Sequence, residues 1–285
     1  MRVLVTGAAG QLGRDVVAAL GRDNSIEVTA ADHGALAVDD PVAVDGLIGS
    51  LLPGIVIHAA ALTNVDLCEE DPQRAHAVNT IGTRNVAGAA ERVGAHLLYV
   101  STDYVFDGRG SRPYRESDET NPISVYGATK LAGERACPDA ATIVRTSWVC
   151  GAHGANFVRT VLELGQRPGK LRFVDDQRGS PTFTEDLAPA VIALALDRRP
   201  GCFHVTNHGE ASRFELARET LALGGADPER VVPISTGELK PARPAARPAY
   251  SVLDNSAFEA AGYRAMPPWR DGLKRLVAQL NAHSR

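Results

Sequence analysis

Cysteine is scarce in this sequence of 285 residues, which contains only Cys68, Cys137, Cys150 and Cys202. The four are widely separated and form no C-x-x-C pair, so they indicate neither a disulfide framework nor a zinc site. We therefore expect them to be buried apolar thiols. None of the eight histidines forms an H-E-x-x-H pair, and no G-x-S-x-G motif occurs. These absences argue against metallohydrolase and serine-hydrolase chemistry.

Long apolar runs and excess positive charge are also lacking. No run approaches the ~18 apolar residues of a membrane-spanning helix, and the apolar start is too short for a signal peptide. A net charge of −4 provides no basic field that would hold nucleic acid or an anionic membrane. We expect a cytoplasmic protein that binds neither and whose partner is a small molecule. Any phosphate group must then be held locally.

Lysine is rare as well, since it accounts for only four of the 30 basic residues. One of them, Lys130, follows Tyr126 at the spacing Y-x-x-x-K inside a helical pattern. On a helix these two positions share one face, with Cβ atoms about 5–6 Å apart. A nearby ammonium lowers the pKa of a tyrosine toward the range where a general acid works best. The pair predicts proton transfer to a carbonyl that receives hydride; the alternative is an exposed helical Tyr-Lys pair.

Apolar strands alternate with helical patterns through the first half of the chain. This alternation predicts a parallel sheet covered by helices on both faces, the doubly wound α/β fold of the Rossmann type. We expect strands at residues 3–5, 27–31, 55–58, 97–100 and 141–149, and helices at 12–20, 41–52, 71–93, 124–137 and 156–164.

The pattern loosens in the second half of the chain. We expect a dinucleotide-binding domain at residues 1–150 and a smaller, irregular, mainly substrate-binding lobe at 151–285, with some elements returning to the main sheet. Further strands are expected at 171–174 and 202–205. The segment 240–248 contains too much proline for a helix or a central strand.

A glycine-spaced loop follows the first strand, with Gly7, Gly10 and Gly13 in the pattern G-x-x-G-x-x-G and with Gln11 and Leu12 between them. Glycines let the backbone turn tightly and approach a pyrophosphate, which the following helix N-terminus attracts. The position at the first strand-helix turn favours a dinucleotide. The alternative is a tight turn without a ligand.

Acidic residues follow the second strand. Asp32 is placed to accept hydrogen bonds from the ribose hydroxyls of NADH and to repel a 2′-phosphate, although it could also be a turn residue. Arg14 and Arg22 lie nearby in the sequence, so NADPH stays open. Asp39 and Asp40 are candidates for capping the next helix or contacting the adenine.

Small and polar residues follow the third, fourth and fifth strands. Ala59, Ala60 and Ala61 leave room for the cofactor backbone. Thr102 lies where an α/β sheet presents groups to a ligand, so its hydroxyl could bind a substrate oxygen; otherwise it belongs to a turn. Trp148 could stack on a sugar or a base, or be a core residue.

Several passages together resemble the extended short-chain dehydrogenase/reductase superfamily and, within it, the dTDP-4-dehydrorhamnose reductase family. The passages that carry this resemblance are 6–13, 59–63, 101–106, 125–134, 145–149 and 176–182. The resemblance implies that Tyr126 is the proton donor, Lys130 its partner and a cofactor-ribose ligand, and Thr102 the third catalytic residue. It also implies that Thr63 contacts the cofactor and that Thr102, Asp103 and Trp148 contact the sugar nucleotide.

The reaction implied by this resemblance is reduction of the C4 keto group of dTDP-4-dehydro-6-deoxy-L-mannose by NADPH or NADH, giving dTDP-L-rhamnose. Arg243 or Arg247 could pair with the substrate diphosphate. Two alternatives stay open: a 4-ketoreductase for another dTDP-deoxysugar, for example of the dihydrostreptose type, and a non-catalytic subunit resembling the regulatory subunit of methionine adenosyltransferase. A monomer and a homodimer both stay open, and no residue spacing names a metal site, so dependence on Mg²⁺ is undecided.

Overall fold

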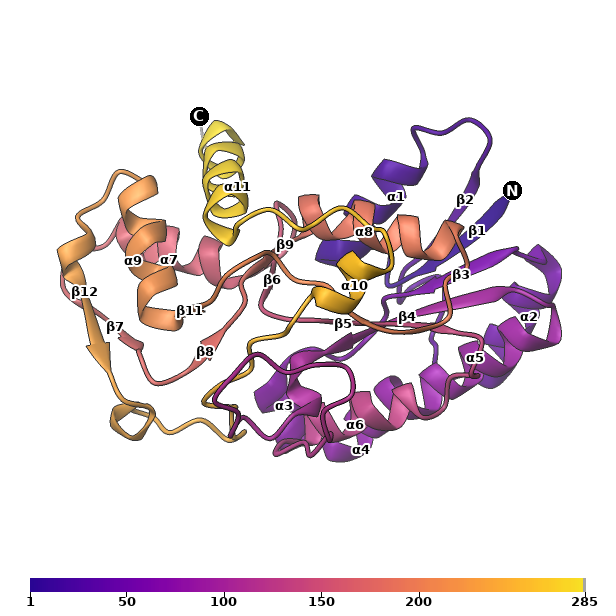
Figure 1. Ribbon diagram of the computed structural model, residues 1–285, viewed down its shortest axis with the longest axis horizontal. Coiled ribbons are helices and arrows are strands. Elements are labelled where there is room, and N and C mark those ends of the chain that lie inside the picture. The colour runs from indigo at the N-terminus through magenta and orange to yellow at the C-terminus, as the bar shows by residue number, and fades with distance from the viewer. Residues whose placement is uncertain (284–285) are drawn as a thin grey trace.

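A six-stranded parallel sheet forms the centre of the computed structural model, which describes residues 1–283 (Figure 1). Its strand order is β10-β5-β4-β3-β1-β2. The strands are β1 (Arg2–Thr6), β2 (Glu27–Ala31), β3 (Ile55–His58), β4 (His96–Thr102), β5 (Thr142–Thr146) and β10 (Gly201–His204). The order reverses between β1 and β3, and doubly wound sheets bind ligands at such a switch point. The predicted fold class is confirmed.

Helices cover both faces of the sheet. Helices α1 (Gln11–Leu20) and α8 (Thr184–Leu196) pack against each other on one face, and α2 (Pro41–Leu51) and α5 (Gly82–Arg92) on the other. Within β1, Val3 and Val5 join the first apolar cluster whereas Leu4 joins the second. Alternate side chains of a strand point to opposite faces, so a continuous apolar run suits a sheet buried on both sides.

The chain between β3 and β4 is more broken than the single helix expected at 71–93, and it packs against α6 (Val125–Glu134). Asn64 caps a short helix α3 (Val65–Glu70) that the sequence patterns did not reveal. Beyond it, α4 (Pro72–His76) and α5 are joined by a π-helical turn, η1 (Ala77–Ile81). This turn lets Asn79 bond to the backbone of Leu62 and to Thr129 of α6. Helical periodicity alone does not reveal such a turn, because long-range bonds stabilise it.

The expected strand at 141–149 ends early, at Thr146. Trp148 has φ +47°, which turns the chain out of the sheet. A short strand β6 (Val149–Cys150) then pairs with β9 (Thr182–Phe183) instead. A positive φ is rare for an aromatic residue, and its energetic cost of about 1–3 kcal/mol is typical of functional sites.

The remaining elements form a smaller lobe at the left of Figure 1 together with connections back to the sheet. Strand β7 (Leu171–Val174) pairs with β12 (Val231–Ile234), and β8 (Arg178–Gly179) pairs with β11 (Ala211–Ser212). The helices and short turns are η2 (Asp103–Val105), α7 (Phe157–Gly165), α9 (Arg213–Leu223), η3 (Pro228–Arg230), η4 (Thr236–Glu238), α10 (Ser256–Ala260) and α11 (Trp269–His283). Strand β10 lies in the main sheet beside β5. The division into domains at residue 150 stays a prediction.

Residues 240–248 contain neither helix nor strand, as predicted from their proline content.

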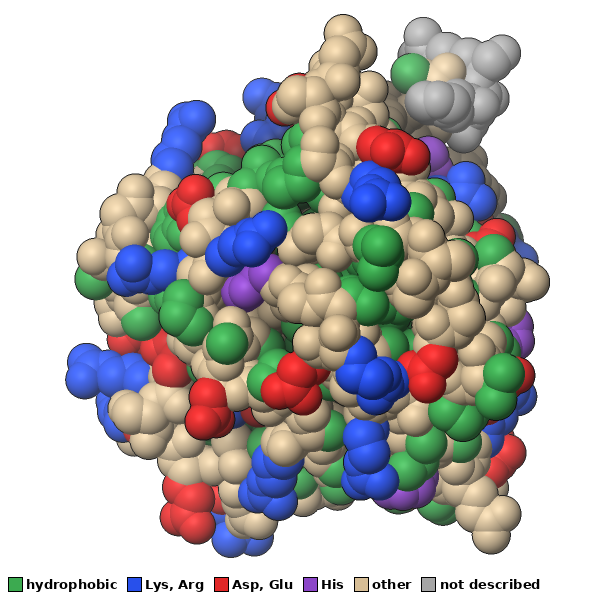
Figure 2. Space-filling model, turned by 90° about the vertical axis from the view of Figure 1, so that its right-hand side faces the viewer, with side chains coloured by type: hydrophobic (Ala, Val, Ile, Leu, Met, Phe, Trp, Pro, Cys, Tyr) green, Lys and Arg blue, Asp and Glu red, His purple; other side chains and the backbone are tan. Residues whose placement is uncertain are grey.

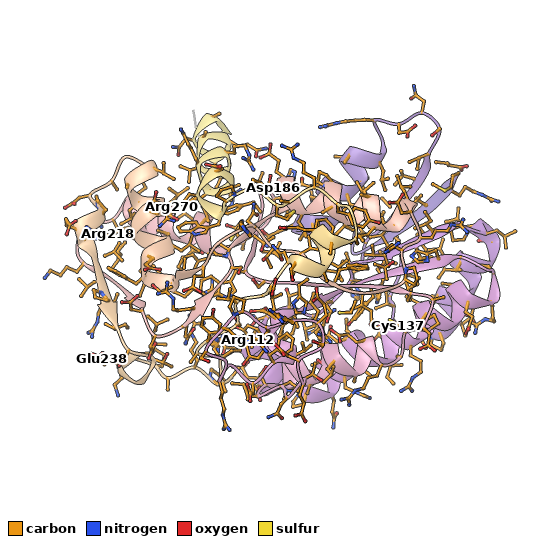
Figure 3. All side chains as sticks on the ribbon, in the orientation of Figure 1. Arg112, Cys137, Asp186, Arg218, Glu238 and Arg270 are labelled. Atoms are coloured by element: carbon orange, nitrogen blue, oxygen red, sulfur yellow. The ribbon has the colours of Figure 1, made fainter. Side chains whose placement is uncertain are left out.

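All four cysteines are free, but only Cys68 and Cys150 are buried; Cys137 and Cys202 are half-buried, so the expectation of four buried thiols is wrong for these two. Cys137 lies beside α6, far from the lobe that carries Arg218 and Glu238 (Figure 3).

Surface charge shows no dominant sign on the face drawn in Figure 2, where basic and acidic side chains are interspersed. Within residues 1–283, no helix combines the length and the apolar character that crossing a bilayer requires.

Candidate active site

A cleft of about 1020 Å³ opens at the carboxyl ends of β1, β3, β4 and β5. It is lined by nearly all the residues that the sequence singled out. These are Gly7, Gly10, Gln11, Leu12, Gly13, Asp32, Asp39, Ala59, Ala60, Ala61, Thr63, Thr102, Asp103, Tyr126, Lys130 and Trp148. Asp40 is not among the lining residues; it caps α2 by accepting from the amides of Val42 and Ala43.

The glycine loop is a cradle in which side chains do not fit. Gly7 has φ +68°, and a Cβ there would lie 2.6 Å from the amide nitrogen of Ala60. A Cβ on Gly13 would lie 2.2 Å from the carbonyl oxygen of Gly7. Gly10 begins α1 without a side-chain cap. The first-turn amides of α1 are therefore available to an anion, and the loop fits a dinucleotide pyrophosphate.

Gln11 also connects this cradle to the rest of the cleft. Its Oε1 accepts from the amide of Gly151 (2.9 Å) and from Nδ2 of Asn156 (3.1 Å). Asn156 in turn caps α7. The side chain of Gln11 therefore fixes the position of the glycine loop relative to α7, in addition to lining the cleft.

Asp32 follows β2 at the cleft wall and is exposed. Its Oδ1 accepts from the amide of Ala35 at 2.9 Å, as in a turn. The position of Asp32 is thus compatible both with a ligand of the cofactor ribose and with a turn residue. Arg14 donates to the carbonyl of Ala9.

Thr102 and Tyr126 meet at the centre of the cleft. Thr102, the last residue of β4, donates through Oγ1 to Asp103 Oδ1 at 3.0 Å and accepts from the amide of Tyr104. Tyr126 lines the cleft beside Thr102, whose hydroxyl acts on the phenol, and its ring meets that of Tyr104 edge to face at 5.6 Å. Ser124 caps α6 and so sets the start of the helix that carries Tyr126. Thr102 and Tyr126 therefore line one cleft.

Burial raises the pKa of Tyr126 above its ordinary value, although the hydroxyl of Thr102 opposes this. The expected net lowering of this pKa is therefore wrong for the structure, because burial has the larger effect. Lys130 Nζ instead donates to the carbonyl of Val100 at 2.8 Å and lies 4.1 Å from the ring centroid of Tyr99. A neutral phenol is the protonation state that a proton donor requires.

A buried ion pair lies behind Lys130 and was not identified from the sequence. Glu134, one turn further along α6, accepts from Arg145 Nε (2.9 Å), Arg145 Nη2 (2.7 Å) and Ser101 Oγ (2.5 Å). Burial lowers the pKa of Lys130 to about 7, and the charge of Glu134 opposes that shift. Glu134 thus favours the charged form of Lys130. The spacing from Lys130 to Glu134 is one helical turn and could have indicated this relation.

Asp103 presents a carboxylate oxygen without a partner. The residue is 2% exposed, and its Oδ2 has no hydrogen-bond partner among the described residues. Burial raises the pKa of Asp103 to about 6, although the hydroxyls of Ser251 and Thr102 oppose this shift. A buried unpaired acceptor beside Thr102 is suited to receive a hydroxyl hydrogen bond from a ligand.

Trp148 lines the cleft opposite the α6 side chains. Gly179 allows its ring to pack closely, because a Cβ there would lie 2.6 Å from Trp148 Cε2. The guanidinium of Arg213 lies 3.5 Å from the Trp148 ring centroid. Arg213 was missed in the sequence, because nothing near it in the chain marks it as a cleft residue.

The two candidate arginines of segment 240–248 line the cleft and share one carboxylate. Asp66 of α3 accepts from Arg243 Nη1 (3.0 Å) and from both terminal nitrogens of Arg247 (2.8 Å each). These bonds, that of Arg247 first, hold the pKa of Asp66 well below its ordinary value although partial burial opposes them. One carboxylate cannot neutralise two guanidinium groups, so this corner carries net positive charge.

No group of three or more metal-ligating side chains was found within the part of the chain that the structure describes.

The fold and the cleft define a nucleotide-cofactor-dependent oxidoreductase of the short-chain dehydrogenase/reductase type. The model of the RmlD substrate binding domain family matches residues 1–282, and the chain belongs to this family.

Named relatives agree with this assignment. The chain is 47% identical to a dTDP-4-dehydrorhamnose reductase of Streptomyces griseus, over 95% of this chain and 91% of the relative. It is 42% identical to a dTDP-4-keto-6-deoxy-D-glucose reductase of Streptomyces niveus, over 99% and 98%. The crystal structure of a dTDP-4-dehydrorhamnose reductase from Bacillus anthracis in complex with NADP superimposes with a TM-score of 0.93, at 38% identity, covering 98% of this chain and 99% of that one.

Proposed function

We propose that the protein reduces the C4 keto group of dTDP-4-dehydrorhamnose to dTDP-L-rhamnose with NADPH or NADH. The observation that carries this proposal is the buried phenol of Tyr126, which lines the same cleft as Thr102 and the glycine cradle. The names of the relatives support the substrate.

The residues of the cleft divide the work of such a reduction. Gly7, Gly10 and Gly13 would hold the pyrophosphate of the cofactor, which when bound supplies the hydride. Tyr126 donates its proton to the oxygen that gains negative charge, and Thr102 fixes the position of that oxygen. Lys130, kept charged by Glu134, stabilises the phenolate that Tyr126 leaves behind.

Substrate choice separates two candidates, because similar relatives are named for reduction of different dTDP-keto sugars. We place dTDP-4-dehydrorhamnose first on the higher identity. The presence of Thr102, Tyr126 and Lys130 around one cleft supports an enzyme over a regulatory subunit. We also propose a cytoplasmic location and a monomer or homodimer.

A competition experiment tests this choice. Purified protein receives equal amounts of dTDP-4-dehydrorhamnose and dTDP-4-keto-6-deoxy-D-glucose with NADPH, and the products are quantified by NMR. We expect dTDP-L-rhamnose as the main product. A main product derived from the gluco-configured substrate would favour the second candidate, and repeating the experiment with NADH would test the role assigned to Asp32.

A further inference from the structure

The arginine side chains that line the cleft differ in whether they pair with a carboxylate. Arg172 pairs with Glu238, and Arg243 and Arg247 pair with Asp66. Arg213 forms no ion pair within residues 1–283; its neighbours are the rings of Trp148 and Phe157, and its charge acts on the phenol of Tyr104. A shielded guanidinium that forms no ion pair costs free energy, so its position calls for an explanation.

The local structure holds Arg213 in place despite this cost. It is the first residue of α9, whose N-cap Ser212 forms a capping box with Glu215. The N-terminal end of a helix carries partial positive charge and disfavours a cation there. Glu215, the nearest acidic residue on the helix, is bonded to Arg178. Neither the helix nor its first turn therefore neutralises Arg213.

Aromatic contacts orient the guanidinium instead. Its carbon lies 3.5 Å from the ring centroid of Trp148 and 5.1 Å from that of Phe157. Stacking on an indole face leaves the N–H groups at the rim of the guanidinium free for acceptors. Trp148 adopts its rare positive φ in forming this stack. The arrangement presents a planar, two-pronged donor to the cleft.

The surroundings place this donor at the sugar-nucleotide end of the cleft. Tyr104, Cys150, Asp103 and Arg247 are the charged and titratable groups whose fields act on Arg213, and none belongs to the glycine cradle. The cofactor phosphates have their own site at the cradle. The remaining anion in the proposed reaction is the diphosphate of the sugar nucleotide, and a guanidinium binds phosphate oxygens bidentately.

We propose that Arg213 binds the diphosphate of the nucleotide-sugar substrate, with Trp148 as the platform that orients it. This inference rests on the proposed function for its substrate class. It adds to Arg243 and Arg247 a third arginine whose charge is not already shared with a carboxylate.

The test measures binding without turnover. Calorimetry gives the dissociation constants of dTDP, thymidine and NADPH for the wild type, Arg213→Met, Arg213→Lys and, as a matched control, Arg172→Met. Methionine retains much of the stacking volume without charge. We expect Arg213→Met to weaken dTDP binding by about tenfold or more, because charge-assisted hydrogen bonds are lost. Thymidine and NADPH affinities should stay near wild type, Arg213→Lys should be intermediate, and Arg172→Met should change little.

Two outcomes would overturn the inference: no binding of dTDP by the wild type, or equal dTDP affinity in the wild type and Arg213→Met. Unchanged NADPH affinity shows that a variant has folded. Reduction of dTDP-4-dehydrorhamnose is assayed separately with the wild type. If dTDP binds through Arg213 but this sugar is not reduced, the proposed substrate fails while the inference stands.

Discussion

The two ends of the cleft differ in whether backbone atoms or side chains form their walls. At the cofactor end, backbone atoms meet at distances that exclude any side chain, as at Gly7 and Gly13. At the other end, long side chains such as Trp148, Arg213 and Arg247 form the walls. A cradle of backbone atoms suits a cofactor shared by many reductases. Side chains, in contrast, can be substituted and so adapt the cleft to different substrates. Substitutions should therefore act on the fold and on cofactor binding at one end, and on substrate affinity at the other.

The largest effect is expected between the two ends, at Tyr126. Tyr126→Phe removes the proton donor but keeps the ring against Tyr104, so kcat should fall about 10²–10⁴-fold while NADPH affinity stays near wild type. Steady-state kinetics and calorimetry check both. Wild-type turnover in this variant would refute the assignment of the proton donor.

At the cradle, Gly7→Ala should abolish or severely weaken NADPH binding, because the new Cβ would lie 2.6 Å from the Ala60 nitrogen at a φ of +68°. Gly46→Ala is the control, since a Cβ at this position in α2 has nothing within 4 Å. That control should stabilise the protein by up to about 1 kcal/mol. If Gly7→Ala bound NADPH normally, the backbone cradle would not be needed.

The charge behind the catalytic centre is tested through its pH dependence. Burial lowers the pKa of Lys130 to about 7, and the negative charge of Glu134 prevents it from falling further. Because the charged lysine is the active form, kcat/KM should fall as pH rises through about 7. Glu134→Gln should move this fall in kcat/KM, the alkaline limb of the pH profile, to lower pH. Thermal melting separates this shift from the destabilisation expected on breaking the pair with Arg145, and an unmoved limb would contradict the role of Glu134.

The smallest effect is expected on stability, at Asp103. Its pKa is raised to about 6 by burial, so the folded state holds a proton that the unfolded state releases at lower pH. The carboxylate therefore costs the wild type stability as pH rises from about 4 to about 6, and the cost persists above that. The difference in free energy of unfolding between Asp103→Asn and the wild type should be about 1–3 kcal/mol more favourable to the variant at pH 7 than at pH 4. Denaturant melts at both values check this, and a pH-independent difference would count against the buried charge.

Local patterns were enough to predict the sheet, the cradle and the helix that carries Tyr126 and Lys130. These features depend on neighbouring residues: apolar runs, glycine spacing and the helical turn. The turn at Trp148, the π-helical turn at Asn79 and the position of Arg213 depend on contacts with distant segments such as Gly179, which no local pattern encodes. The wrong direction for the pKa of Tyr126 has the same origin, because burial is a property of the whole fold.

The most direct measurement of the central claim is NADPH consumption by the purified wild-type protein with enzymatically prepared dTDP-4-dehydrorhamnose, followed by NMR of the product. We expect one dTDP-L-rhamnose to be formed for each NADPH oxidised. Tight NADPH binding without consumption in the presence of this substrate would contradict it.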